Sequence, residues 1–161
     1  MSVAVRNAGL TTVKVQFSGG SLETLGYTRN GAEVGEHAYY EDVHGDENGG
    51  DSGPPIDIQY LGQIAIIRID CTKFEIAVIN KIRARLKSGT VGTPGTPGTF
   101  MFADDKSFRF LLDNTNDPRN FTRCICRDEI GSNTGTKYQS WSLVIEAHKD
   151  GSGVLWNTTT S

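Results

Sequence analysis

Gln63-Ile-Ala-Ile-Ile-Arg-Ile-Asp70 is the stretch that decides the fold class of this chain, because it has the composition of a β-strand covered on both faces. Alternate residues of a strand share a face, and isoleucine stands on both faces here. Branching at Cβ suits a pleated sheet better than a helix. We therefore predict a strand at the centre of a sheet, or one that a helix covers on one side.

Shorter strand patterns precede this stretch. Val13–Phe17 alternates apolar and polar residues with the period of two that is typical of a half-buried strand. Asn30-Gly31 favours a tight turn, so it predicts a hairpin that joins a strand near residues 22–29 to another near 32–40. Ile56–Tyr60 alternates as well and leads into the isoleucine-rich stretch.

One helix is predicted directly after the central strand, over about residues 72–87. Thr72 and Glu75 have the spacing of a capping box, in which each side chain binds a free backbone amide at the start of a helix. Gly89 is placed to end it. A single apolar stripe follows with helical spacing, formed by Phe74, Val78, Ile79, Ile82 and Leu86.

Strand patterns return after a connector of glycine, threonine and proline at residues 89–99. Turns are predicted at residues 104–106 and 131–135, between the candidate strands Thr99–Ala103, Ser107–Leu112, Phe121–Cys126, Thr136–His148 and Val154–Trp156. Seven or eight strands with one helix predict a single, mainly β domain over residues 1–161. We expect an antiparallel β-sandwich or a curved, barrel-like sheet.

The charges of the chain are strongly segregated. Between Arg29 and Arg68 there is no lysine or arginine, yet this stretch holds eight carboxylates: Glu33, Glu36, Glu41, Asp42, Asp46, Glu47, Asp51 and Asp57. Its centre, a long acidic loop at residues 41–55, is rich in glycine and has almost nothing to bury. A structureless loop of this length is uncommon in a compact domain unless it is functional or disordered, so its role is the main question that the sequence poses.

No motif for catalysis or for a bound cofactor is found in the sequence. Phosphate-binding, nucleophile-elbow and zinc-protease signatures are all missing, so we expect neither an enzyme nor a cofactor. His37 and His44 lie among acidic residues, but a strand and a loop would hold them apart. Asp46–Asp51 resembles a calcium loop with its fifth and sixth positions reversed. We therefore expect no dedicated metal site.

The cysteines and the hydropathy indicate which classes of protein the chain does not resemble: disulfide-rich secreted proteins and membrane-spanning proteins. An odd number of cysteines, without an apparent secretory signal, argues against a disulfide framework. Cys124 and Cys126 would share one face of a strand, which predicts a buried pair of thiols. No run of residues approaches the roughly 18 apolar positions that a membrane span needs. No nucleic-acid-binding signature is visible either.

Three segments and the order of the predicted elements carry a resemblance to a known family. The segments are Gly45–Gly62, which contributes most, Lys137–Glu146 and Ala147–Trp156. A hairpin leads into a long acidic loop, then into a central strand that runs directly into one helix. This arrangement resembles the tail tube (major tail) proteins of tailed bacteriophages, and with the helix the resemblance spans nearly the whole chain.

The resemblance implies a structural role in a virion. Tail tube proteins are small β-sandwich-like domains with one helix that assemble as hexameric rings, and the rings stack into a hollow tube. The implied partners are further copies of the chain and other phage tail proteins, without a membrane, and DNA passes through the tube without specific binding. The implied location is the phage tail of a virion, assembled in the host cytoplasm. Strands of six subunits would complete an inner β-barrel and remove exposed sheet edges.

The resemblance also implies roles for the acidic stretch. An inter-subunit loop would be residues 41–55, with the candidate residues Glu41, Asp42, Asp46, Glu47, Asp51, Pro54 and Pro55. Its carboxylates would meet bases of a neighbour, with the candidates Lys81, Arg83, Arg85 and Lys87. Acids on the flanking strands would line the tube, where carboxylates do not attract DNA, with the candidates Glu33, Glu36 and Asp57. The sequence does not decide between these assignments.

Two other functions stay open at this point. A head-decoration or tail-completion protein of a phage would belong to the same virion, but it would be monomeric or form a single ring. A carbohydrate-binding β-sandwich would use Trp141, Trp156 and Tyr138 to stack on sugar rings. The strand residues that flank both tryptophans favour a core role for them instead.

Overall fold

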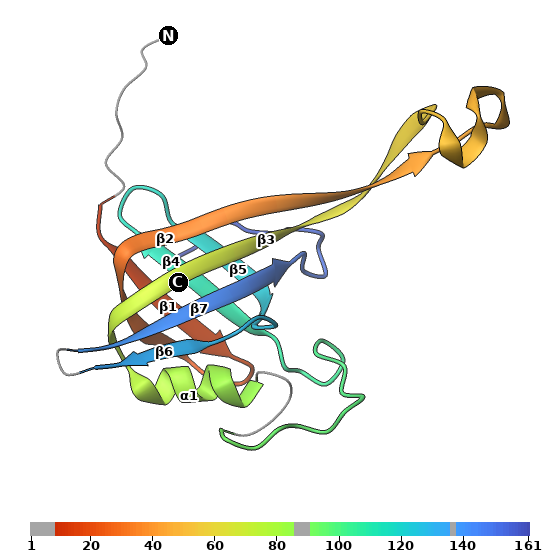
Figure 1. Cartoon of the computed structure of the whole chain (residues 1–161). Coiled ribbons are helices and arrows are strands. Elements are labelled where there is room, and N and C mark those ends of the chain that lie inside the picture. The colour runs from red at the N-terminus through yellow and green to blue at the C-terminus, as the bar shows by residue number, and fades with distance from the viewer. Residues whose placement is uncertain (1–8, 86–90, 136–137) are drawn as a thin grey trace, which may run out of the picture.

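The computed structural model describes residues 9–85, 91–135 and 138–161, and within these ranges the chain forms one antiparallel sheet, one α-helix and two short 3₁₀ turns (Figure 1). In chain order the elements are β1 Thr11–Phe17, β2 Leu22–Val43, η1 Asp46–Asn48, η2 Gly50–Ser52, β3 Asp57–Phe74, α1 Ile76–Arg85, β4 Phe108–Asn114, β5 Arg119–Ile125, β6 Gly131–Thr134 and β7 Gln139–His148.

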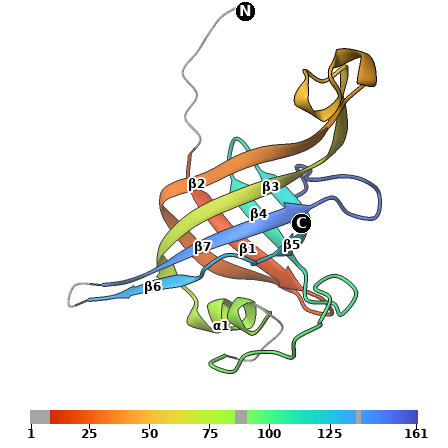
Figure 2. The same ribbon diagram turned by 45° about the vertical axis from the view of Figure 1, so that its right-hand side comes forward.

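The sheet closes on itself as a barrel. Its hydrogen-bonded order is β3-β2-β1-β4-β5-β7, and β7 pairs in turn with β3. On its other edge β7 pairs with β5 at residues 146–148 and with β6 at residues 139–142. The closing pairs run from Ala65↔Ala147 to Cys71↔Trp141. Figure 2 shows the ring of strands from a second side. The prediction of a mainly β fold with a barrel-like antiparallel sheet and one helix is confirmed.

The isoleucine-rich stretch lies in β3, which pairs with β2 on one side and with β7 on the other, as predicted for a central strand. Ala65, Ile67 and Ile69 point into the barrel and are buried. The same core includes apolar residues of every strand of the ring, among them Val13, Val15, Leu25, Phe110, Phe121, Leu143 and Ile145.

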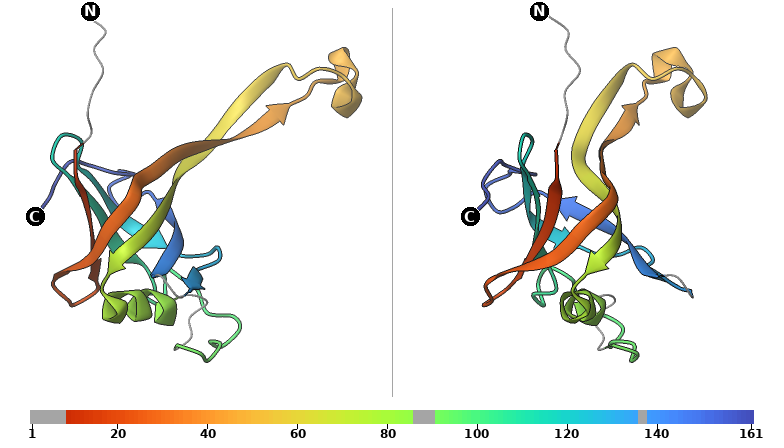
Figure 3. Two further views of the ribbon diagram at one scale, coloured as in Figure 1. Left: turned by 60° about the vertical axis from the view of Figure 1, so that its left-hand side comes forward. Right: turned by 90° about the vertical axis from the view of Figure 1, so that its left-hand side faces the viewer.

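Helix α1 lies across one end of the barrel (Figure 3). Val78, Ile79 and Ile82 of the predicted apolar stripe are buried in the barrel core. Phe74 packs partly buried against that core, but it belongs to the end of β3. Leu86 and Gly89, which were expected to extend and to end the helix, lie outside the described residues.

The predicted start of the helix at Thr72 is wrong. β3 continues to Phe74, which pairs with Gly26 of β2, so Thr72 is a strand residue. Glu75 occupies the position before the helix: its carbonyl accepts the amides of Val78 and Ile79. Long-range pairing with β2 therefore outweighs the local capping pattern.

The predicted hairpin at Asn30-Gly31 is also wrong. β2 passes through this dipeptide as one strand of 22 residues, and its register with β3 shifts between Thr28 and Ala32. Gly31 has a φ of 84°. A bulge uses positive φ just as a tight turn does, and pairing with the long strand β3 on both sides of the dipeptide selects the bulge.

The last third of the chain departs from the prediction in three places. Residues 99–103 are not a strand, since the chain turns there and Lys106 donates its amide to the Met101 carbonyl. The expected loop at 131–135 contains β6, whose residues pair with β7. Val154–Trp156 is not a strand either, and a single bridge instead joins Asn157 to Asn120. β4, β5 and β7 lie where strands were predicted, within a few residues.

The long acidic loop is shorter and more ordered than predicted. β2 runs to Val43 and β3 begins at Asp57, so Glu41 and Asp42 are strand residues. Between the strands lie the two 3₁₀ turns. We call residues 38–62 the arm and residues 44–56 its tip. The arm projects far beyond the barrel, at the end of the molecule opposite α1 (Figures 1 and 3).

Candidate assembly interface

The arm is a ribbon of two strands with no further strand beside it in the described structure. Its pairs run from Ala38↔Gln63 to Val43↔Asp57, and β1 and β7 pair only with the parts of β2 and β3 that lie in the barrel. A ribbon of two strands is marginally stable in water by itself. The arm therefore has the form of an element that a partner completes.

One face of the arm is aromatic and apolar. Tyr40 and Tyr60 are cross-strand neighbours whose rings meet edge to face at 5.8 Å, and Ile58 follows on the same face. These three side chains are 61%, 55% and 57% exposed. Further exposed apolar side chains of the arm are Tyr39, Val43, Ile56 and Leu61. Tyr39 and Val43 belong to the other face of the ribbon, and Asp42 shares the face of Ile58. Exposed apolar side chains gathered on one element mark an interaction site more often than scattered ones do.

No residue of the 3₁₀ turns of the tip is buried. Backbone hydrogen bonds and closely packed glycines hold the tip instead. The Ile56 amide donates to the Val43 carbonyl at 2.8 Å and closes the base of the tip. At Gly53 a Cβ atom would come within 1.6 Å of the Asn48 carbonyl oxygen, so the chain can cross there only with glycine. The tip is consequently a built turn that needs no apolar core.

The tip displays negative charge to solvent. Asp46, Glu47 and Asp51 are exposed, and none of them forms an ion pair with a residue that the structure describes. Pro54 and Pro55 lead from the tip back into β3. Glu41 and Asp42 stand lower on the arm, and as neighbours along one strand they point to opposite faces.

The three acids predicted to line a tube do not share one surface. Glu33 lies opposite Arg68 and, like it, faces away from the barrel interior. Asp57 lies opposite Val43 on the arm, beyond a register shift between Tyr39 and Tyr40, so the alternation of β3 in the barrel does not extend to it. Glu36 lies on the other side from Glu33, opposite Ala65. Its Oε1 accepts a hydrogen bond of 2.8 Å from the indole of Trp156.

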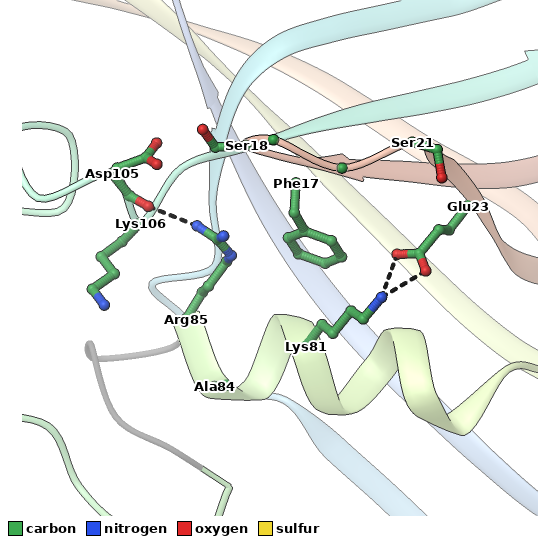
Figure 4. Close-up of a pocket in the computed structure, with 11 residues that line it drawn as sticks. Phe17, Ser18, Ser21, Glu23, Lys81, Ala84, Arg85, Asp105 and Lys106 are labelled. Carbon is green, nitrogen blue, oxygen red and sulfur yellow. Dashed lines mark hydrogen bonds and ion pairs between the residues drawn. The ribbon is translucent and has the colours of Figure 1, made fainter.

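Two of the predicted bases lie side by side on α1, at the wall of a groove (Figure 4). Lys81 pairs with Glu23 at 2.6 Å. Arg85 donates to the Asp105 carbonyl at 2.6 Å, and its guanidinium lies 5.0 Å from the centre of the Phe17 ring. The groove has a volume of about 640 Å³.

The other two predicted bases are not brought to this groove. Arg83 donates to Asn80 at 3.1 Å and stacks on the Trp141 ring at 5.2 Å, which directs it to another side of the helix. Lys87 lies outside the described residues. Lys106 was missed by the sequence analysis, yet it lines the groove. The hydrogen bond between Arg85 and Asp105 positions its loop, and no sequence pattern predicts this contact.

The residues considered for sugar stacking do not form a common platform. Trp141 is only 6% exposed and packs edge to face with Phe74, so its predicted core role is confirmed. Trp156 is partly buried between Glu36 and the guanidinium of Arg119. Only Tyr138 is substantially exposed, at 52%.

The described thiols are weakly acidic, and the described side chains form no cluster that could hold a metal ion. Cys71, Cys124 and Cys126 are buried, and burial raises the pKa of the Cys71 thiol to about 11 and that of Cys126 to about 12. The pKa of Cys124 is raised as well. Among the described residues no group of three or more His, Cys, Asp or Glu side chains could hold a metal ion. The described part of the chain contains no helix with the length and apolar content that crossing a membrane requires.

Comparison with solved structures gives a likeness of fold. A chain in the virion of a native gene transfer agent particle superposes with a TM-score of 0.54 at 14% identity, over 98% of this chain and 100% of that one. A chain in the tail of an empty gene transfer agent particle, refined with C6 symmetry, gives a TM-score of 0.45 at 17% identity, over 93% and 96%. Only the first is close enough to bear on the fold. No protein-family model and no curated protein matches the sequence.

Proposed function

We propose that this protein is a structural component of a phage-type tail, in which copies assemble as hexameric rings that stack into a tube for the genome. The observation that carries the proposal is the arm. It projects from a closed, well-packed barrel as a two-stranded ribbon with exposed apolar side chains, and no further described strand pairs with it. The resemblance of the sequence to tail tube proteins supports the ring and the tube. The fold shared with a chain of a gene transfer agent virion agrees with it.

The arm lacks a neighbour in the described structure that would cover its exposed apolar side chains. Exposed apolar side chains gain free energy when a partner removes them from water, by about 25 cal/mol for each Å² buried. The outer edge of the arm also offers unpaired amides and carbonyls, which natural proteins protect or pair. A neighbouring copy would satisfy both requirements at once, because each copy carries an arm and a barrel surface.

The proposed tube needs a lumen that does not hold DNA. Carboxylates offer no binding energy to phosphates, so acids on the lumen surface would let DNA slide. Glu33 and Asp57 are both exposed on the β2–β3 ribbon and remain candidates for that surface. Glu36 is a weaker candidate, since its carboxylate is engaged by Trp156. The proposed role is thus structural, without a catalytic site or a cofactor.

Electron microscopy of the concentrated, purified protein tests the proposal. We expect six-fold rings and hollow tubes of stacked rings. A protein that stays monomeric at every concentration and salt would contradict the proposal. Single rings that never stack would instead favour a head-decoration or tail-completion protein, which could use the same arm within one ring.

A further inference from the structure

We infer that the groove between α1 and the β1–β2 turn receives the acidic tip of the arm of a second copy of this chain. This inference rests on the proposed function and adds the docking partner of the tip. The walls of the groove are Lys81 and Arg85 of α1, residues 18–21 of the turn, and Lys106 of the loop that precedes β4 (Figure 4). The ring of Phe17 lies between these walls.

The charges of the tip and the groove are complementary. The tip carries Asp46, Glu47 and Asp51 and lies in a stretch without lysine or arginine. In the groove, Arg85 binds backbone carbonyls, which are neutral, and neither Arg85 nor Lys106 forms an ion pair within the described structure. Two acids, Glu23 and Asp105, also line the groove, but three cations outnumber them.

The shapes are complementary as well. The tip is a compact double turn that stands clear of the rest of the molecule (Figures 1 and 2). The groove is an open recess of about 640 Å³ rather than a closed cavity, and its lining includes Phe17, Ala84 and the glycines of the β1–β2 turn. A protruding turn with exposed acids can enter such a recess without a rearrangement of the barrel.

The positions of the two surfaces fix the kind of contact. The arm leaves one end of the barrel, and α1 with its groove lies at the other end (Figure 3). A contact between opposite ends of identical copies is heterologous, so each copy offers one tip and one groove, and the contact repeats along a filament unless it closes into a ring. Head-to-tail repetition of this kind is what the stacking of rings requires.

Charge exchange tests the inference. The groove variant combines Arg85→Glu with Lys106→Glu, and the tip variant combines Asp46→Lys, Glu47→Lys and Asp51→Lys. We expect each variant alone to lose tubes at concentrations at which the natural chain forms them, and the combined variant to regain tubes. The single variant Lys106→Glu is matched by Lys149→Glu, an exposed lysine outside the groove, which should leave tube formation unchanged. Circular dichroism checks that each variant folds.

A cross-link gives a second readout that does not depend on Arg85. Cysteines introduced by Asp51→Cys and Lys106→Cys should form disulfide-linked multimers in assembled tubes, whereas the control pair Asp51→Cys and Lys149→Cys should not. The natural chain could form tubes while the combined variant regains none and the cross-link does not form. That result would overturn the groove assignment and leave the proposed function standing. A natural chain that forms no tubes would overturn both.

Discussion

Gly26 of β2 is paired on both sides, with Val13 of β1 and with Phe74 of β3. Its φ is 153°, and a Cβ atom there would lie 2.1 Å from the Lys73 carbonyl oxygen and 2.8 Å from the Phe74 Cα. The approach is between backbones, so no side-chain movement can relieve it. A single glycine thus permits the close approach at which β2 passes from its pairing with β1 to its pairing with β3.

Gly26→Ala should lower the free energy of unfolding by about 2 kcal/mol, because a methyl group forced into a packed site moves the backbone around it. Gly35→Ala is the matched control on the same strand: its added Cβ would meet nothing within 4 Å. Urea denaturation of the three proteins measures the effect. Equal midpoints for both variants would contradict the close approach.

The buried thiols predict a second effect at the residue scale. Their pKa values are raised by burial, so unfolding makes the thiols more acidic. For such groups the stabilising contribution is complete below the unfolded pKa of 9.0 and is lost as the pH rises through the folded values. We expect the free energy of unfolding to fall as the pH rises from 9 toward 11, and less so in Cys124→Ala. In the native state at pH 8, thiol reagents should react only on unfolding.

At the scale of elements, the sequence predicted what local periodicity determines. The alternation in β3 and the spacing of Val78, Ile79 and Ile82 in α1 are local patterns, and both elements form. The start of α1 and the bulge at Asn30-Gly31 were missed because the partner strand decides them. The candidate role of the acids of the tip could be predicted from the charge pattern alone. The position of Lys106 in the groove could not, because it depends on tertiary contacts of its loop.

The aromatic face of the arm predicts a separation between folding and assembly. Tyr40→Ser with Tyr60→Ser should change the free energy of unfolding of the monomer by less than about 1 kcal/mol, because both rings are largely exposed. The same variant should lose rings or tubes, since the arm no longer offers an apolar surface. Sedimentation velocity and microscopy measure the assembly. Phe110→Ser, in the core, is the contrasting variant that should lose the fold itself.

The tip predicts a narrower loss. Deletion of residues 46–52 removes both 3₁₀ turns but leaves the ladder of the arm intact. We expect the shortened chain to fold and to form single rings, while ring stacking fails. Normal tubes from this variant, seen by electron microscopy, would show that the tip does not couple the rings.

At the scale of the whole molecule, the barrel separates two chemically different ends. The arm end is acidic at its tip and apolar along the ribbon, and the α1 end carries the basic groove. The overall charge of −3 hides this arrangement. The sequence alone could reveal the segregation of charge along the chain, but only the fold shows that the two charged surfaces lie at opposite ends.

This arrangement predicts that stacking depends on salt. Exposed charges are screened beyond about 3 Å at 1 M salt, compared with about 10 Å at 0.1 M. The yield of tubes should therefore fall between these concentrations, while the apolar contacts of the arm persist. Turbidity and electron microscopy across a salt series measure the effect. A yield that rises with salt would instead indicate that apolar burial dominates the contact between rings.

The continuity of β2 and β3 from the barrel into the arm has a mechanical consequence. A pull on the tip would run along both strands, and the ladder bonds of an antiparallel sheet lie perpendicular to that direction. The bonds that join β2 to β1 and β3 to β7 would then be loaded in shear, all at the same time. An arm gripped by a neighbour would thus anchor a stretched filament to the whole barrel, and it would yield only when several bonds break together.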